Sequence, residues 1–202
     1  MSRYIFSIFC ANTQTVLISS LIATIIIFQF GLQEMTVPAL AQATTDDFTT
    51  YENPIYGINM LYPLDWTQSV NPLQSYTDVV AFYSPFQNFT DNLPSEVTLS
   101  VRTYSGNVSL NNYTEFALAS LEQQGVRFNE YNVFQLAGNT AHSILFSPPE
   151  SVNVPISSSG MMVWTALDNK IYQIIFNAEK SKFDDHLPLV RQMIDSLQIQ
   201  PQ

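Results

Sequence analysis

Several segments of this 202-residue chain alternate apolar and polar residues with the two-residue period of half-buried β-strands. The clearest is residues 96–102, in which Val97, Leu99 and Val101 alternate with polar side chains. Short apolar runs at 58–62 and 79–83 predict two more strands. Four further runs predict two hairpins, because each pair flanks a short turn containing Gly, Asn or Asp. These pairs are 126–136 with 140–146, and 161–167 with 171–176.

Two segments change to the three- and four-residue spacing of amphipathic helices. In 109–124 we expect Ser109 to be the N-cap. In 181–197 we expect Ser181 to cap the start and the regular helix to begin at Pro188, which lacks a backbone N–H. The order of strands, helix, four strands and helix predicts an antiparallel β-sheet with helices packed on it, a fold of the α+β class.

The first 41 residues have a different pattern. Arg3 precedes an apolar run at 16–32, which as a helix would span about 26 Å. Ala39 and Ala41 then place small side chains where a signal peptidase reads them. We therefore expect residues 1–41 to be a signal peptide or, alternatively, an uncleaved membrane anchor with 16–32 as the tether. Both interpretations place the rest of the chain outside the cytoplasm.

The exported part is expected to consist of a flexible polar stalk at 42–50 and one domain at 51–199. It carries three Asn-x-Ser/Thr triplets, which support export because each is an acceptor sequence for N-glycosylation. The candidate glycosylation sites are Asn88, Asn107 and Asn112.

Composition narrows the functional classes. Seventeen acidic and seven basic residues give a formal net charge of −10, which argues against nucleic-acid binding. The apolar content of 46% with only 12% charged residues excludes a disordered chain. The single cysteine, Cys10, excludes an intrachain disulfide and a cysteine zinc site. It also precedes the apolar run, so it does not fit a lipoprotein anchor.

Several short motifs occur in a fixed order along residues 51–199. They are Tyr56-Gly57-Ile58 leading to Tyr62-Pro63-x-x-Trp66, Val80 to Pro85 (VAFYSP), the helix around 113–121, Leu136-Ala137-Gly138-x-x-Ala141, the Trp164…Tyr172 hairpin and Met193-Ile194-x-Ser196. In order and spacing these motifs resemble PsbP-like domains.

The resemblance implies an α/β/α sandwich around an antiparallel sheet. The name-giving family member is an extrinsic subunit of photosystem II, associated with calcium and chloride retention at the oxygen-evolving centre. Many other members are exported proteins of unassigned role. The long N-terminal arm with which the photosystem subunit docks is not matched by the polar stalk, so we carry over the fold and not the photosystem role.

Catalytic motifs are not apparent in the sequence. It contains no G-x-S-x-G elbow, no H-E-x-x-H and no glycine-rich phosphate loop. His142 shares a strand face with Ile144 and Phe146, which favours a partly buried, hydrogen-bonded histidine over a catalyst. We therefore expect that the protein is not an enzyme; a weak hydrolase is the alternative.

The compact cluster Asp184, Asp185 and His186 contains the candidate metal ligands. Successive residues on a helix point about 100° apart, so the three side chains do not all face one ion. The other interpretation is a solvated helix start in which the two carboxylates favour the positive end of the dipole. Calcium is the one cofactor that we consider for this cluster.

Aromatic residues supply the ligand or interface candidates, Trp66 and Trp164. Burial in the core is the default for such side chains, and a surface cluster would instead indicate a ligand groove or a protein interface.

The leading hypothesis is an exported, non-enzymatic binding or accessory module at the outer face of the cell membrane, whose partner is a membrane or cell-surface protein or a small ligand. The alternatives are a carrier of a small apolar ligand, held between sheet and helix, and a weak calcium-binding protein.

Overall fold

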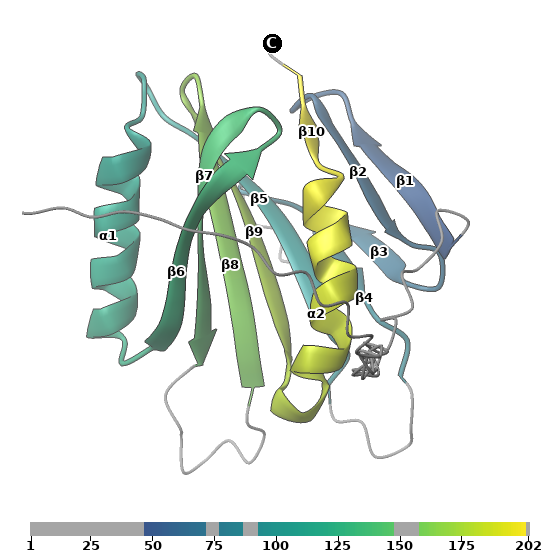
Figure 1. Ribbon diagram of the computed structural model, residues 1–202. Coiled ribbons are helices and arrows are strands. Elements are labelled where there is room, and N and C mark those ends of the chain that lie inside the picture. Colours follow the sequence, from purple (N-terminus) through teal and green to yellow (C-terminus); the bar gives the residue numbers. More distant parts are fainter. Residues whose placement is uncertain (1–46, 72–76, 87–92, 148–157, 201–202) are drawn as a thin grey trace, which may run out of the picture. The chain divides into compact units, whose positions relative to one another are not determined.

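The computed structural model describes residues 47–71, 77–86, 93–147 and 158–200 (Figure 1). All of them belong to one compact unit of the chain, residues 41–202. Within these ranges no helix is both long enough and apolar enough to cross a membrane.

Two antiparallel sheets and two helices make up the described part of the chain (Figure 1). The larger sheet has the strand order β3 (Thr67–Val70), β4 (Asp78–Tyr83), β5 (Glu96–Thr103), β9 (Lys170–Glu179), β8 (Ser158–Leu167), β7 (Asn139–Ser147) and β6 (Arg127–Leu136). The smaller sheet has the order β1 (Phe48–Asn53), β2 (Ile58–Pro63) and β10 (Gln198–Ile199). The helices are α1 (Leu110–Gln123) and α2 (Lys180–Asp195).

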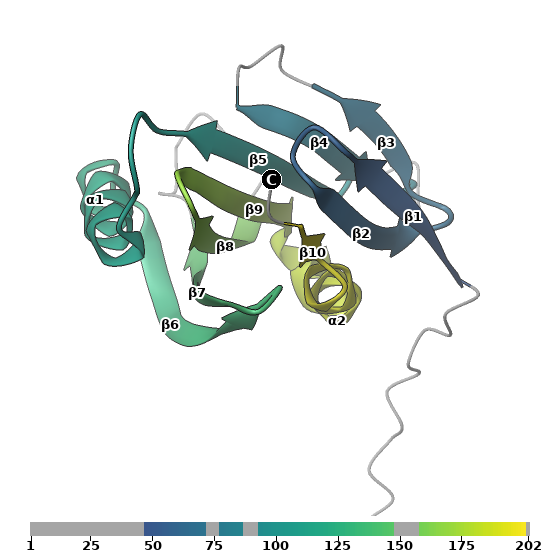
Figure 2. The ribbon, with the colours of Figure 1, turned by 90° about the horizontal axis from the view of Figure 1, so that it is seen from above.

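The helices cover opposite faces of the larger sheet (Figure 2). Strand β8 shows the consequence, because its side chains alternate between two cores. Met161 and Val163 belong to the core beneath α2 and the smaller sheet, whereas Met162 and Trp164 belong to the core beneath α1. The structure thus confirms the α+β class and the predicted α/β/α sandwich.

Turn chemistry explains why the two hairpins could be predicted. Ala137 (φ 49°) and Gly138 (φ 78°) both have positive φ, which gives the β6–β7 turn its type I′ geometry. Asp168 (φ 54°) has the same left-handed conformation between β8 and β9. Ser109 caps α1 as expected, because its hydroxyl accepts a hydrogen bond from the backbone N–H of Asn112.

Two of the family motifs bind the C-terminal end of the chain to the smaller sheet. Gly57 has φ +65°, and a Cβ at this position would collide with the backbone oxygen of Gln200. The backbone N–H of Gln200 donates a hydrogen bond of 2.9 Å to the Gly57 carbonyl. The Ser196 hydroxyl donates to the Met193 carbonyl at 2.6 Å and accepts from the Leu61 N–H at 2.9 Å. Each motif therefore has a specific structural role.

The start of α2 differs from the prediction. The helix begins at Lys180, so Ser181 is not its cap and Pro188 lies inside it. The ring of Phe183 stacks on Phe176 with centroids 5.2 Å apart. This packing anchors the turns that precede Pro188, and it outweighs the one backbone hydrogen bond that proline removes.

The sequence patterns did not predict β1, β3 or β10. Strand β1 begins at Phe48, so residues 48–50 belong to the smaller sheet and not to the expected stalk. In β1 the only buried residue is Tyr51, and β10 contains two residues. Their strand character comes from pairing with β2, a tertiary effect that local periodicity does not report.

Candidate functional site

A hydrogen-bonded polar cluster surrounds His142 beneath α1. Its Nδ1 lies 2.8 Å from Oγ1 of Thr114 and 2.9 Å from the phenol oxygen of Tyr131. Nε1 of Trp164 donates to Oγ1 of Thr114 at 2.8 Å, and that hydroxyl donates to the Leu110 carbonyl at 2.8 Å. Every member of the cluster therefore has a hydrogen-bond partner within the protein.

This cluster has the properties of a structural core. Trp164 is fully buried, and the His142 ring packs edge-on against Trp164 and Tyr131. Burial lowers the pKa of His142, so the ring is held neutral. The expectation of a buried, hydrogen-bonded histidine is confirmed. Trp164, a candidate for a ligand or interface residue, lies in the core beneath α1.

A second histidine cluster lies beside α2. Nδ1 of His186 is 2.6 Å from Oγ of Ser95, and Ser95 and Ser84 exchange two hydrogen bonds of 2.9 Å. Trp66, the other aromatic candidate, is buried and packs edge-on against His186 with centroids 5.9 Å apart. Ser95 is only 1% exposed, so this serine–histidine pair is closed to a substrate.

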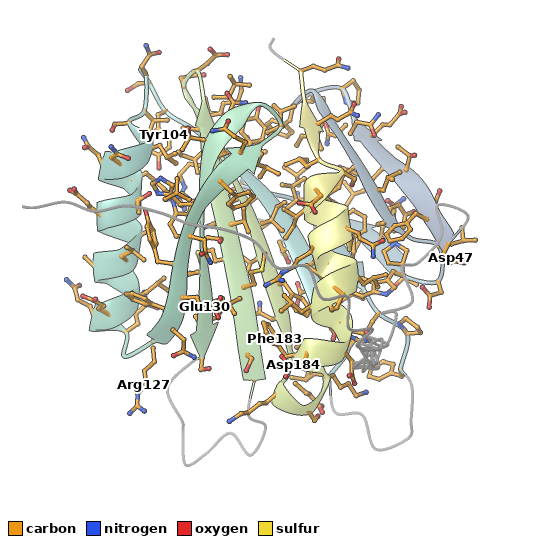
Figure 3. The ribbon with its side chains drawn as sticks, viewed as in Figure 1. Asp47, Tyr104, Arg127, Glu130, Phe183 and Asp184 are labelled. Carbon is orange, nitrogen blue, oxygen red and sulfur yellow. The ribbon has the colours of Figure 1, made fainter. Side chains whose placement is uncertain are left out.

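Charges around His186 act in opposite directions. Burial lowers its pKa most strongly, Lys182 lowers it further, and Asp185 and Asp65 raise it. Asp184 and Asp185 are exposed on α2, beyond its first turn, whereas Phe183 is buried (Figure 3). Within the described ranges no three His, Cys, Asp or Glu side chains come together as a metal site.

The candidate glycosylation sites fall in different places. Asn107 is exposed before α1, and Asn112 is exposed on α1. Thr114, the third residue of the Asn112 triplet, is buried in the His142 cluster. Asn88 and the apolar run 16–32 lie outside the described residues.

An open groove of about 210 Å³ lies between α2 and the outer strands of the larger sheet. Its lining is contributed by β6 (Glu130, Asn132, Phe134), β7 (Ser143, Leu145), β8 (Met161) and α2 (Arg191, Ile194, Asp195). Glu130 lies on the stretch of β6 beside the groove, whereas Arg127 projects away from the lower end of the strand (Figure 3).

Strand and helix periodicity account for this lining. Alternate residues of β6 share one face of the sheet, and Arg191, Ile194 and Asp195 occupy positions i, i+3 and i+4 on one face of α2. Apolar side chains form the floor, and Phe134 and Leu145 pack against the main core.

The polar side chains of the groove differ from the two histidine clusters. In the part of the chain that the structure describes, none of the five has a side-chain hydrogen bond or an ion pair. Ser143 is only 8% exposed, but among the described residues no buried side-chain oxygen or nitrogen lacks a hydrogen-bond partner, so its unpartnered hydroxyl must reach the solvent of the groove. Glu130, Asn132, Arg191 and Asp195 are exposed, so water hydrates them and they are available to a partner. An apolar floor with such polar groups around it has the composition of a binding surface.

The groove is not apparent from the sequence. Glu130 and Asn132 lie in a predicted strand, and Arg191 and Asp195 lie next to the apolar stripe of a predicted helix. These polar residues lie beside apolar ones on the same elements, and this was the available signal. What the sequence does not give is that α2 packs on β9, β8 and β2 and forms one wall of a groove whose other wall is β6 and β7.

Comparisons with known proteins support the fold. No family model matches the chain, and no curated protein matches it. Cyanobacterial PsbP (CyanoP) from Synechocystis is similar, with a TM-score of 0.58 and 12% identity over 80% of this chain and 99% of that one. LpqN of Mycobacterium tuberculosis, described as involved in cell envelope biogenesis, gives a TM-score of 0.57 and 14% identity over 76% and 91%.

The Ran-binding protein Mog1p of Saccharomyces cerevisiae is also similar, with a TM-score of 0.52 and 10% identity over 75% of this chain and 95% of that one. At these identities the likeness establishes a PsbP-like fold and confirms the predicted resemblance at that level. Proteins with different described roles share this architecture, so function has to be argued from the site.

Proposed function

We propose that this protein is an exported, non-enzymatic binding module that serves as an accessory to a membrane or cell-surface protein, with the groove as its contact site. The observation that carries the proposal is a groove with an apolar floor, surrounded by polar and charged side chains that are mostly exposed and have no hydrogen-bond or ion-pair partner among the described residues. Folding leaves these groups available, and a partner can satisfy them.

The local chemistry favours binding over catalysis. Ser95 and His186 form a hydrogen-bonded pair, but Ser95 is closed to solvent. His142 is likewise occupied by Thr114 and Tyr131. In the groove, the Ser143 hydroxyl has no base within hydrogen-bond distance among the described residues, so the arrangement that activates a serine nucleophile is lacking there.

The size of the groove favours a protein partner over a carried apolar ligand. Pockets for drug-sized ligands usually enclose about 300–1,000 Å³. The groove has about 210 Å³ and is lined by charged as well as apolar residues. It therefore suits part of a partner surface better than a whole small apolar molecule.

Export rests on the leader pattern of residues 1–41 and on the three glycosylation triplets. The intact mass of the protein from its own host tests it. We expect a mass lacking the leader, or the full chain in the membrane fraction, with hexose-containing additions if the triplets are used. A cytosolic protein that retains Met1 would contradict export.

Site-specific photo-crosslinking in the native host tests the binding role. A photoreactive residue replaces Asn132 in the groove and, as the matched control, the exposed Asn111 on α1. We expect a discrete crosslinked product with an envelope or membrane protein from position 132 only. No product, or the same products from both positions, would refute the proposal.

A further inference from the structure

We infer that the groove binds an extended segment of the partner protein that inserts one bulky apolar side chain and places a lysine or arginine beside it. This inference rests on the proposed binding function and specifies the chemistry of the partner.

The floor of the groove selects the apolar side chain. Phe134, Leu145, Met161 and Ile194 present aliphatic, aromatic and thioether groups that continue the main core. The volume of about 210 Å³ corresponds to about seven water molecules at about 30 Å³ each. That space suits one large side chain with part of its backbone.

The walls of the groove select the charge. Glu130 stands on the β6 side, and Arg191 and Asp195 stand one turn apart on the α2 side. Two carboxylates against one guanidinium make the lining acidic, and none of the three is neutralised by an ion pair within the described ranges. A cationic side chain beside the apolar anchor complements this pattern, and the net charge of −10 attracts it.

The remaining polar groups suit a peptide backbone. Ser143 offers a hydroxyl that is accessible from the groove, and Asn132 offers an exposed amide that both donates and accepts. Arg191 supplies further donors for carbonyl oxygens. An extended segment exposes its N–H and C=O groups at short intervals, so these side chains can hold it on either side of the anchor.

Charge also argues against a second copy of this chain as the occupant. A copy would bring a second net charge of −10 to an acidic groove. Like-charge contact disfavours such a pair, whereas a basic segment is steered toward the site.

The inference is tested by selecting binders from a random peptide library displayed on phage. The consensus sequence is then made as a synthetic peptide, and its affinity for the protein is measured by titration. We expect sequences with Lys or Arg within two residues of Leu, Ile, Met or Phe. Glu130→Lys and Asp195→Lys should each lower the affinity for the titrated peptide by about ten-fold, because each replaces an attractive charge with a repulsive one.

The matched control is Glu122→Lys on the exposed face of α1, because it changes the net charge by the same amount away from the groove. Its affinity for the peptide should equal that of the wild type. Acidic consensus sequences, failure to select any peptide, or equal weakening by Glu122→Lys would overturn the inference. If Asn132 still crosslinks a partner in the host, the binding function stands and only the assigned chemistry fails.

Discussion

Adjacent residues on β7 have opposite surroundings. His142 points beneath α1 into a cluster in which every polar side chain has a hydrogen-bond partner, whereas Ser143 points toward α2 into a groove in which no polar side chain has a partner among the described residues. Tyr131 and Asn132 on β6 divide in the same way. One pair of strands thus has a stabilising face and an open face, and the hydrogen bonding of each face indicates its role.

The largest effect on stability is expected on the stabilising face, around His142. Thr114→Val keeps the side-chain volume but removes the acceptor for Trp164 and the contact with His142. Leaving buried polar groups unsatisfied should lower the free energy of unfolding by about 2–4 kcal/mol. Urea denaturation measures this loss. Asn112→Gln is the control, because it removes the same glycosylation triplet and keeps the Thr114 hydroxyl. If Thr114→Val lowers the free energy of unfolding by less than about 0.5 kcal/mol, the structural role of the cluster is contradicted.

The two histidine clusters should also make stability depend on pH. Burial lowers the pKa of His142 and of His186, so the unfolded chain, with histidine pKa values near about 6.5, binds protons more readily. The stabilisation is complete above about pH 6.5 and is lost as the pH falls from there toward the folded-state pKa values.

Denaturation at several pH values between about 5.5 and 7.5 measures this slope, which is at most about 1.4 kcal/mol per pH unit for each histidine. His142→Gln should remove the part of the pH dependence of stability that comes from this histidine. A profile in His142→Gln as steep as that of the wild type would show that the ring is not held neutral by its surroundings.

The smallest effect on stability is expected on the open face. Ser143→Ala and Arg191→Gln remove groups that have no partner within the described part of the chain, so the free energy of unfolding should change by no more than about 0.5 kcal/mol. Thermal unfolding of these variants, measured together with that of Thr114→Val, compares the two faces directly. Loss of more than about 1 kcal/mol in Arg191→Gln would mean that the guanidinium stabilises the fold.

The parts of this fold that the sequence predicted are those with local signals. Residues 96–102 alternate cleanly, Ser109 caps a helix, and Gly138 fits a tight turn. The first turns of α2 escaped prediction because the packing of Phe183 overrides Pro188. Strand β1 escaped because pairing with β2 defines it.

The candidate site could be predicted only in fragments. Glu130 and Arg191 are 61 positions apart in the sequence, and neither belongs to a recognised motif. They line the same groove because α2 packs on β9 and β8, next to β7 and β6, an arrangement that depends on the whole fold. Trp66 and Trp164, chosen for their aromatic character, proved to be buried beside the two histidines.

A high-resolution crystal structure of the protein tests the central claim most directly, because it shows what satisfies the polar groups on each face of β6 and β7. The account predicts ordered water or a bound segment on Glu130, Asn132, Ser143, Arg191 and Asp195, and direct hydrogen bonds between Nδ1 of His142 and the side chains of Thr114 and Tyr131. Ion pairs from Arg191 to Glu130 or Asp195, with the Ser143 hydroxyl bonded inside the protein, would contradict it.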